Sequence, residues 1–119
     1  MAQAFDIDIS RLGSGAVVVS VTGDIDLFTT PEFKQGVSEA MSREADRVIV
    51  DLSRSTFMDS SSLGVLIGAH RRMARRGRLL TVVCDNEAIL KVLRVTGLDS
   101  VFDVVGSLPA ASDRVAVSR

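Results

Sequence analysis

Val-Ile-Val-Asp-Leu-Ser-Arg-Ser-Thr-Phe-Met-Asp-Ser-Ser-Ser-Leu-Gly-Val-Leu-Ile-Gly occupies residues 48–68, and the rest of the chain can be interpreted outward from it. Its largely apolar start, Val48 to Leu52, is typical of a buried strand. From Leu63 onward, apolar residues recur with helical spacing. The serines at 60–62 therefore stand where a strand passes into a helix. Unpaired backbone N–H groups and the helix dipole favour an anion at such a place.

A serine at this junction can be a helix cap, a nucleophile, a phosphate-binding group or a phosphate acceptor. A nucleophile needs a base, but the single histidine, His70, lies about 15 Å along the same predicted helix from Ser60. The chain also lacks the G-x-S-x-G elbow of esterases and a Walker phosphate loop. Capping by Asp59 or Ser60 and phosphate acceptance both remain open, since the first turn of a helix tolerates a dianion.

The flanking sequence predicts an α/β fold, a mixed sheet of about five strands with helices packed against it. Alternation over Phe5–Ser10, the turn at 12–15 and the β-branched run Ala16–Thr22 indicate an antiparallel hairpin. Thr30 is expected to cap a helix that has Pro31 at its first position. Further elements are expected at 31–43 (helix), 47–52 (strand), 60–76 (helix), 78–84 (strand), a helix capped by Asp85 or Asn86 and ended by Gly97, 101–105 (strand) and 107–112 (short helix). These make one domain over 1–112, with 113–119 as a flexible tail.

The composition of the chain limits the classes of function that it can have. The chain has 119 residues, 46% of them apolar and 24% charged, as in a globular domain. A formal net charge of −1 and the absence of Trp and Tyr disfavour nucleic acid as a partner. No apolar run approaches the roughly 18 residues of a membrane span, and no signal sequence is seen. With Cys84 as the single cysteine, we expect a cytoplasmic protein without membrane association.

Other candidate sites are weaker. One His and one Cys cannot form a zinc site, and no cofactor is expected. Asp24, Asp26 and Asp59 are weak grounds for magnesium, and turn formation is the simpler interpretation of the first two. The arginines at 71, 72, 75, 76 and 78 indicate either a solvated helix face or a surface for an acidic partner.

Gly64 and Gly68 lie one helical turn apart in the predicted helix, where each glycine costs about 1 kcal/mol relative to alanine. Two explanations stay open. The helix packs closely on the sheet there, or it leaves a bare face beside the serines for a partner.

The chain resembles the anti-sigma factor antagonists, the single-domain bacterial members of the STAS (sulphate transporter and anti-sigma antagonist) superfamily. The resemblance runs from about Phe5 to Val105. The segments that carry it are Gly-Asp-Ile-Asp at 23–26, Thr-Thr-Pro at 29–31, Val-Asp-Leu at 50–52, Phe-Met-Asp-Ser-Ser at 57–61, Leu-Gly-Val-Leu at 63–66 and Val-Thr-Gly-Leu at 95–98.

The resemblance implies a protein that is not an enzyme and that acts by binding. In this family the unphosphorylated antagonist binds an anti-sigma factor, usually a serine kinase of the histidine-kinase-like ATPase type, and thereby releases the sigma factor. Phosphorylation breaks the complex, and a PP2C-type phosphatase restores it. An alternative is a STAS interaction subunit of a transporter or a stress-signalling assembly that never takes phosphate.

The family motif places the phosphate acceptor at Ser60, with Ser61 as the alternative. Ser62 stands where the family usually has glycine, so we expect it to alter the fit of the kinase or to offer another hydroxyl. The expected partner-binding residues are Asp24, Asp26, Thr29, Thr30, Asp59, Ser61, Ser62, Gly64 and Gly68.

Overall fold

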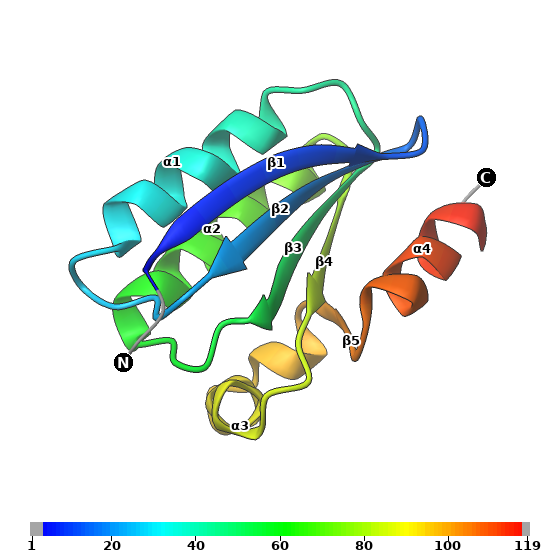
Figure 1. Cartoon of the computed structure of the whole chain (residues 1–119). Helices are drawn as coiled ribbons and strands as arrows, with labels where there is room; N and C mark the ends of the chain where they lie inside the picture. The colour runs from blue at the N-terminus through cyan, green and yellow to red at the C-terminus, as the bar shows by residue number, and fades with distance from the viewer. Residues whose placement is uncertain (1–3, 118–119) are drawn as a thin grey trace.

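The computed structural model describes residues 4–117, with side chains through Val115. A five-stranded sheet in the order β1-β2-β3-β4-β5 forms its centre (Figure 1). β1 pairs antiparallel with β2, and the remaining strands run parallel, which confirms the predicted mixed sheet and hairpin. The elements are β1 (Asp6–Leu12), β2 (Ala16–Thr22), α1 (Thr30–Met41), β3 (Arg47–Arg54), α2 (Ser60–Arg75), β4 (Leu79–Val83), α3 (Glu87–Val95), the 3-10 turn η1 (Leu98–Ser100), β5 (Asp103–Val105) and α4 (Leu108–Val117).

The sheet separates two apolar clusters because alternate residues of a strand point to opposite faces. In β2, Val17, Val19 and Val21 join the larger cluster, which also contains buried residues of α1, α2 and α3. Ala16 and Val18 face the smaller cluster, which contains Ala111 of α4. Figure 1 accordingly shows α1 and α2 together on one side of the sheet and α4 on the other.

The helix ends follow from local chemistry. Asn86, one of the two expected caps, accepts a 3.1 Å hydrogen bond from the N–H of Ile89 and starts α3. Thr30 is not the cap of α1 that we expected. The helix begins at Thr30 itself. The Thr30 hydroxyl donates a 2.7 Å hydrogen bond to the carbonyl of Asp26. Gly77, with a φ of +66°, follows α2 in the left-handed conformation that glycine adopts without strain.

The short helix expected at 107–112 is longer in the structure, where α4 continues to Val117. The helix is held by side chains: Arg114 forms a 3.1 Å ion pair with Asp103 of β5. That carboxylate also faces the buried Arg47, at 3.4 Å, and accepts from Thr81 at 3.1 Å. Residues 118 and 119 lie outside the described part. Among the helices described, none is long and apolar enough to cross a membrane.

Candidate functional site

Two loops meet at the end of the sheet where β2 and β3 finish, and they place the predicted serines. Ile25 and Met58 form an isolated parallel bridge that prolongs the pairing of the two strands. The N–H of Ile25 donates to the carbonyl of Phe57 at 2.9 Å, and the N–H of Asp59 donates to the carbonyl of Ile25 at 3.1 Å. The loop after β2 and the start of α2 therefore form one hydrogen-bonded unit.

Asp59 is the N-cap of α2. Its Oδ1 accepts from the backbone N–H groups of Ser61 and Ser62 at 3.1 and 3.3 Å, and from the Ser61 hydroxyl at 2.6 Å. The Ser61 hydroxyl and the N–H groups of the first turn stabilise the carboxylate and hold the pKa of Asp59 below its usual range, although partial burial opposes this. Of the two caps that the sequence left open, the structure identifies Asp59.

The three serines of the junction have different environments. Ser60 is exposed, and its hydroxyl makes no hydrogen bond with any residue that the structure describes. Ser61 is also exposed, but its hydroxyl is engaged with Asp59 and lies 3.1 Å from the hydroxyl of Thr30. A free, exposed hydroxyl can approach a phosphate donor without breaking a contact. This geometry favours Ser60 over Ser61 as the acceptor.

Ser62 is not a surface residue, which corrects its expected role in partner binding. Its side chain is fully buried, at 0% exposure. The hydroxyl lies 3.1 Å from the carbonyl oxygen of Ile25, and 3.0 and 3.1 Å from the carbonyl and Oδ1 of Asp59. It can donate to any of these acceptors. The buried side chain of Ser62 therefore connects α2 to the loop after β2, which carries Ile25, and adds nothing to the outer surface. We call this segment the Ile25 loop.

The loop that carries Asp26 is ordered by its own side chains. Oδ1 of Asp26 accepts from the N–H groups of Phe28 and Thr29 at 2.9 and 3.0 Å, an Asx-type turn. The Thr29 hydroxyl donates to the carbonyl of Asp24 at 2.9 Å. The Asp24 carboxylate accepts from Thr56 at 3.1 Å and so joins this loop to the one before α2. Asp24, Asp26, Thr29 and Thr30 thus lie beside the serines, as expected, and shape the loop.

Gly64 and Gly68 do not pack closely on the sheet. A Cβ added at either position would lie more than 4 Å from every described atom outside the neighbouring residues and the nearby helix backbone. Gly36 of α1 offers a contrast, because a Cβ there would lie 2.9 Å from Ile7. The two glycines of α2 line a hollow of about 380 Å³ between α1 and α2, together with Lys34, Val65, Arg71, Arg72 and Arg75. This favours the bare-face interpretation.

Sequence reasoning missed three apolar side chains in these two loops. Leu27 is 68% exposed, Phe28 89% and Phe57 48%. Large apolar groups so exposed, on neighbouring loops beside a polar rim, are typical of a protein-binding surface. The loop position of Phe28, between Asp26 and Thr30, was the available signal, but its exposure depends on the turn that Asp26 builds. We call Leu27, Phe28, Phe57 and Ser60 the loop surface.

The remaining reactive groups have structural explanations. His70 packs edge-on against Phe102, with ring centroids 5.7 Å apart. Burial raises the pKa of the Cys84 thiol, which suppresses its reactivity. No cluster of three metal-ligating side chains was found among the residues described.

Known proteins share this architecture. Residues 9–106 match the family described as "Mlab, STAS domain". An anti-sigma-B factor antagonist of Listeria monocytogenes is 26% identical over 98 residues, covering 82% of this chain and 86% of that protein. An anti-sigma factor antagonist from Mycobacterium paratuberculosis, solved by crystallography, has a TM-score of 0.87 at 26% identity and covers 95% of each chain. Bacillus SpoIIAA in its phosphorylated form shares the fold, with a TM-score of 0.70 at 22% identity over 92% of this chain and 99% of that one. The chain belongs to the STAS domain family, and it is similar to the anti-sigma factor antagonists within it.

Proposed function

We propose that this chain is an anti-sigma factor antagonist that works as a phosphorylation switch. Its unphosphorylated form binds an anti-sigma factor with serine-kinase activity and so frees the sigma factor. Phosphate on Ser60 breaks the complex, and a PP2C-type phosphatase removes it. The chain acts by binding, in the cytoplasm where the sigma factor is found. The single observation that carries the proposal is the free, exposed hydroxyl of Ser60 beside the Asp59 cap.

The position of Ser60 explains how the domain can accept phosphate without unfolding. Ser60 is the first residue of α2, where the helix dipole and free N–H groups favour negative charge. Its side chain makes no contact that phosphorylation would break among the residues described. The folded state therefore tolerates the modification.

The same position explains how phosphate would break a complex. A phosphoserine carries about −1.5 to −2 charges at neutral pH. On this chain the charge would appear next to the Asp59 cap, at the end of the loop that carries the exposed side chain of Phe57. A partner that covers the loop surface would have to bury that dianion, and the desolvation cost would outweigh the apolar contacts. The small hydroxyl of unmodified Ser60 carries no such cost.

The experiment is phosphorylation of the purified chain by anti-sigma kinases of its host with ATP, followed by intact mass and peptide mapping. We expect one phosphate, on Ser60, with no product from Ser60→Ala. Ser61→Ala is the matched control, because it also removes one hydroxyl from the same turn, and we expect it to be phosphorylated. Phosphate found only on residues other than Ser60, or none with any host kinase, contradicts the proposal.

Binding gives an independent test. Ser60→Glu should weaken the complex with the kinase by at least about tenfold, through the desolvation of the added charge. The thermal midpoint of the free domain should stay within about 2 °C of the wild type, because the exposed Ser60 side chain makes no hydrogen bond with the residues described. A large fall in the midpoint would instead identify Ser60 as a structural residue.

A further inference from the structure

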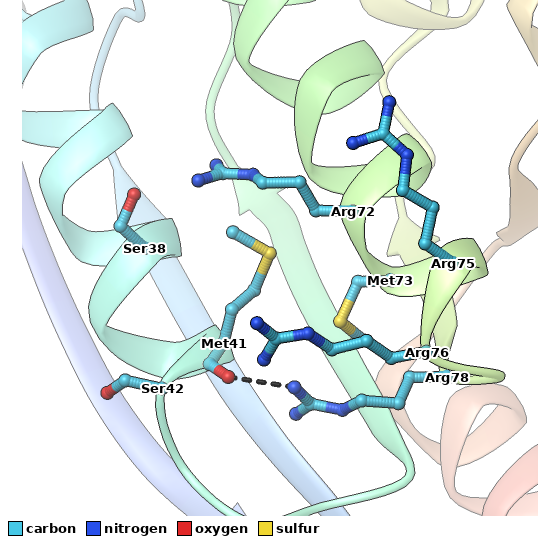
Figure 2. Close-up of a pocket in the computed structure, with 8 residues that line it drawn as sticks. All are labelled: Ser38, Met41, Ser42, Arg72, Met73, Arg75, Arg76 and Arg78. Carbon is cyan, nitrogen blue, oxygen red and sulfur yellow. Dashed lines mark hydrogen bonds between the residues drawn. The ribbon is translucent and has the colours of Figure 1, made fainter.

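The second surface of interest lies along α1 and α2 and starts one turn of α2 beyond Ser60. Two hollows of about 380 and 400 Å³ lie next to each other along these helices, with Arg72 and Arg75 lining both. Their lining combines Gly64, Gly68, Met41 and Met73 with cationic side chains. Figure 2 shows Arg72 and Arg76 extending from α2 toward α1, with the Met41 side chain beside their guanidinium ends. We call this the basic groove.

Five cations of the basic groove have no counter-charge. Within the part of the chain that the structure describes, the side chains of five residues form no ion pair or hydrogen bond: Lys34, Arg71, Arg72, Arg75 and Arg76. Arg78, in contrast, donates to the carbonyls of Met41, Arg43 and Ala45 at 2.8, 3.0 and 2.7 Å and holds the chain after α1. Arg78 therefore has a structural role that accounts for its position, and the other five do not.

Helix electrostatics explains only some of these cations. Arg72 and Arg75 lie in the last turn of α2, where the dipole favours positive charge. Lys34 lies beyond the first turn of α1 and gains nothing from the dipole, and Arg71 and Arg75 stand four residues apart as a like-charge pair that weakens the helix. An uncompensated basic patch in a chain whose net charge is −1 calls for an acidic ligand.

We propose that the basic groove binds an acidic helical segment of a protein partner. From Gly64 to Arg76 the groove runs about 18 Å along α2, the length of roughly three helical turns. The bare glycines Gly64 and Gly68, with the half-buried Val65 between them, leave room for the backbone of a helix to approach closely. Glu or Asp residues of that helix would meet the five cations.

A protein ligand fits the basic groove better than nucleic acid does. The groove starts one turn of α2 beyond Ser60, so a polyanion that followed it would reach the carboxylates of Asp59 and Asp26. The region also lacks aromatic side chains on which bases could stack. Because the basic groove and the loop surface share α2, we assign both to one partner, the anti-sigma factor. On that point alone the inference rests on the proposed function.

The first experiment uses a fluorescent 14-residue amphipathic peptide with Glu on one face and Leu on the other, at low ionic strength. We expect binding to the wild type, with shifts of the Gly64 and Gly68 amide signals in ¹⁵N-correlated spectra. Arg72→Gln/Arg75→Gln should weaken binding by about tenfold, since two charge contacts are lost. Lys91→Gln, which removes an exposed cation of α3, is the control and should bind within about twofold of the wild type. Equal binding by the groove variant, or amide shifts confined to other residues, overturns the proposal.

Two further arms test the kind of ligand and the glycine lining of the groove. A DNA duplex and vesicles that contain phosphatidylglycerol should bind more weakly than the peptide, and tighter binding of either by the same arginines overturns the assignment to protein. Gly68→Ala adds one methyl to the lining of the groove, so we expect a higher thermal midpoint and weaker peptide binding. A stabilised variant that binds the peptide unchanged also contradicts the proposal.

The complete complex separates this inference from the proposed function. With an anti-sigma kinase of the host, Arg72→Gln/Arg75→Gln should lower the affinity about tenfold and reduce its salt dependence. If Ser60→Glu breaks the complex but the groove variant does not weaken it, the groove inference fails and the proposed function stands. If the peptide binds in the groove but no anti-sigma protein binds the chain, the proposed function fails and the acidic-helix site stands.

Discussion

The hydroxyl of Ser61 donates a 2.6 Å hydrogen bond to Oδ1 of Asp59, within the first turn of α2. Of the interactions that lower the pKa of Asp59 in the folded state, this hydrogen bond contributes most. The charged carboxylate caps the helix, so the folded state favours its ionised form. The start of α2, where the proposed switch lies, is therefore sensitive to acid.

The first prediction concerns pH. The pKa of Asp59 is lower in the folded than in the unfolded chain, so its contribution to stability is present above the unfolded pKa and is lost as the pH falls through the folded pKa. We expect Asp59→Asn, which still caps but does not titrate, to lose less stability than the wild type between about pH 5 and about pH 2. Urea unfolding at several pH values measures this.

An NMR titration of the Asp59 carboxyl carbon provides the control. Its pKa should rise when Ser61→Ala removes the strongest donor and should stay unchanged in Ser60→Ala, whose hydroxyl does not reach the carboxylate. An Asp59 that titrates at or above the ordinary value of an aspartate would contradict the prediction.

The second prediction concerns Ser62. Because its buried hydroxyl joins α2 to the Ile25 loop, Ser62→Ala should lower the free energy of unfolding by about 1 kcal/mol and the thermal midpoint by about 3–6 °C. Phosphorylation of Ser60 should persist in this variant. Ser60 stands two residues before Ser62 and is exposed, so Ser60→Ala should leave the midpoint unchanged. Equal midpoints for all three proteins would show that the Ser62 hydroxyl contributes nothing to stability.

Much of the fold could be predicted because it depends on local sequence. The apolar run at 48–52 and the helical spacing after Leu63 are visible without any tertiary contact. The end of the chain could not be predicted in this way. α4 reaches Val117 because Ala111 packs on the sheet and Arg114 pairs with Asp103, and neither contact is visible in the pattern of residues 108–117.

In the candidate site, too, the features that depend on local sequence could be predicted and those that depend on distant contacts could not. The sequence placed Asp59 and Ser60 at the start of a helix, since capping chemistry is local. It could not show that Ser62 is buried, because the Ile25 carbonyl that its hydroxyl meets is 37 residues away. Nor could it show that Phe28 is exposed, since an isolated phenylalanine beside a helix start is as often part of a core.

The third prediction concerns the loop surface. Phe28→Ser should weaken binding of the anti-sigma kinase by at least about tenfold, as expected for a central apolar contact. The stability of the free domain should change by less than about 0.5 kcal/mol, because the side chain is 89% exposed. Val95→Ser is the matched control: Val95 is 77% exposed on α3, and its replacement should leave binding unchanged. Binding of Phe28→Ser at wild-type affinity would place the interface elsewhere.

The fourth prediction concerns Asp103, which faces both Arg47 and Arg114. Asp103→Ala leaves the guanidinium of Arg47, buried at 6% exposure, without a counter-charge, and should cost about 2 kcal/mol of unfolding free energy. Arg114→Ala removes only a half-exposed partner and should cost about 0.5 kcal/mol. Urea denaturation of both variants measures the difference. If the two costs are equal, Arg47 does not depend on Asp103.

The bridge between Ile25 and Met58 has a consequence for timing. It makes both loops a continuation of the parallel strands, so the residues around Ser60 are already arranged before a partner arrives. A preorganised surface loses little conformational entropy on association. If Ser60 is the switch, phosphate changes the charge on a fixed shape and no refolding step intervenes. The speed of the response is then the speed of the kinase and the phosphatase.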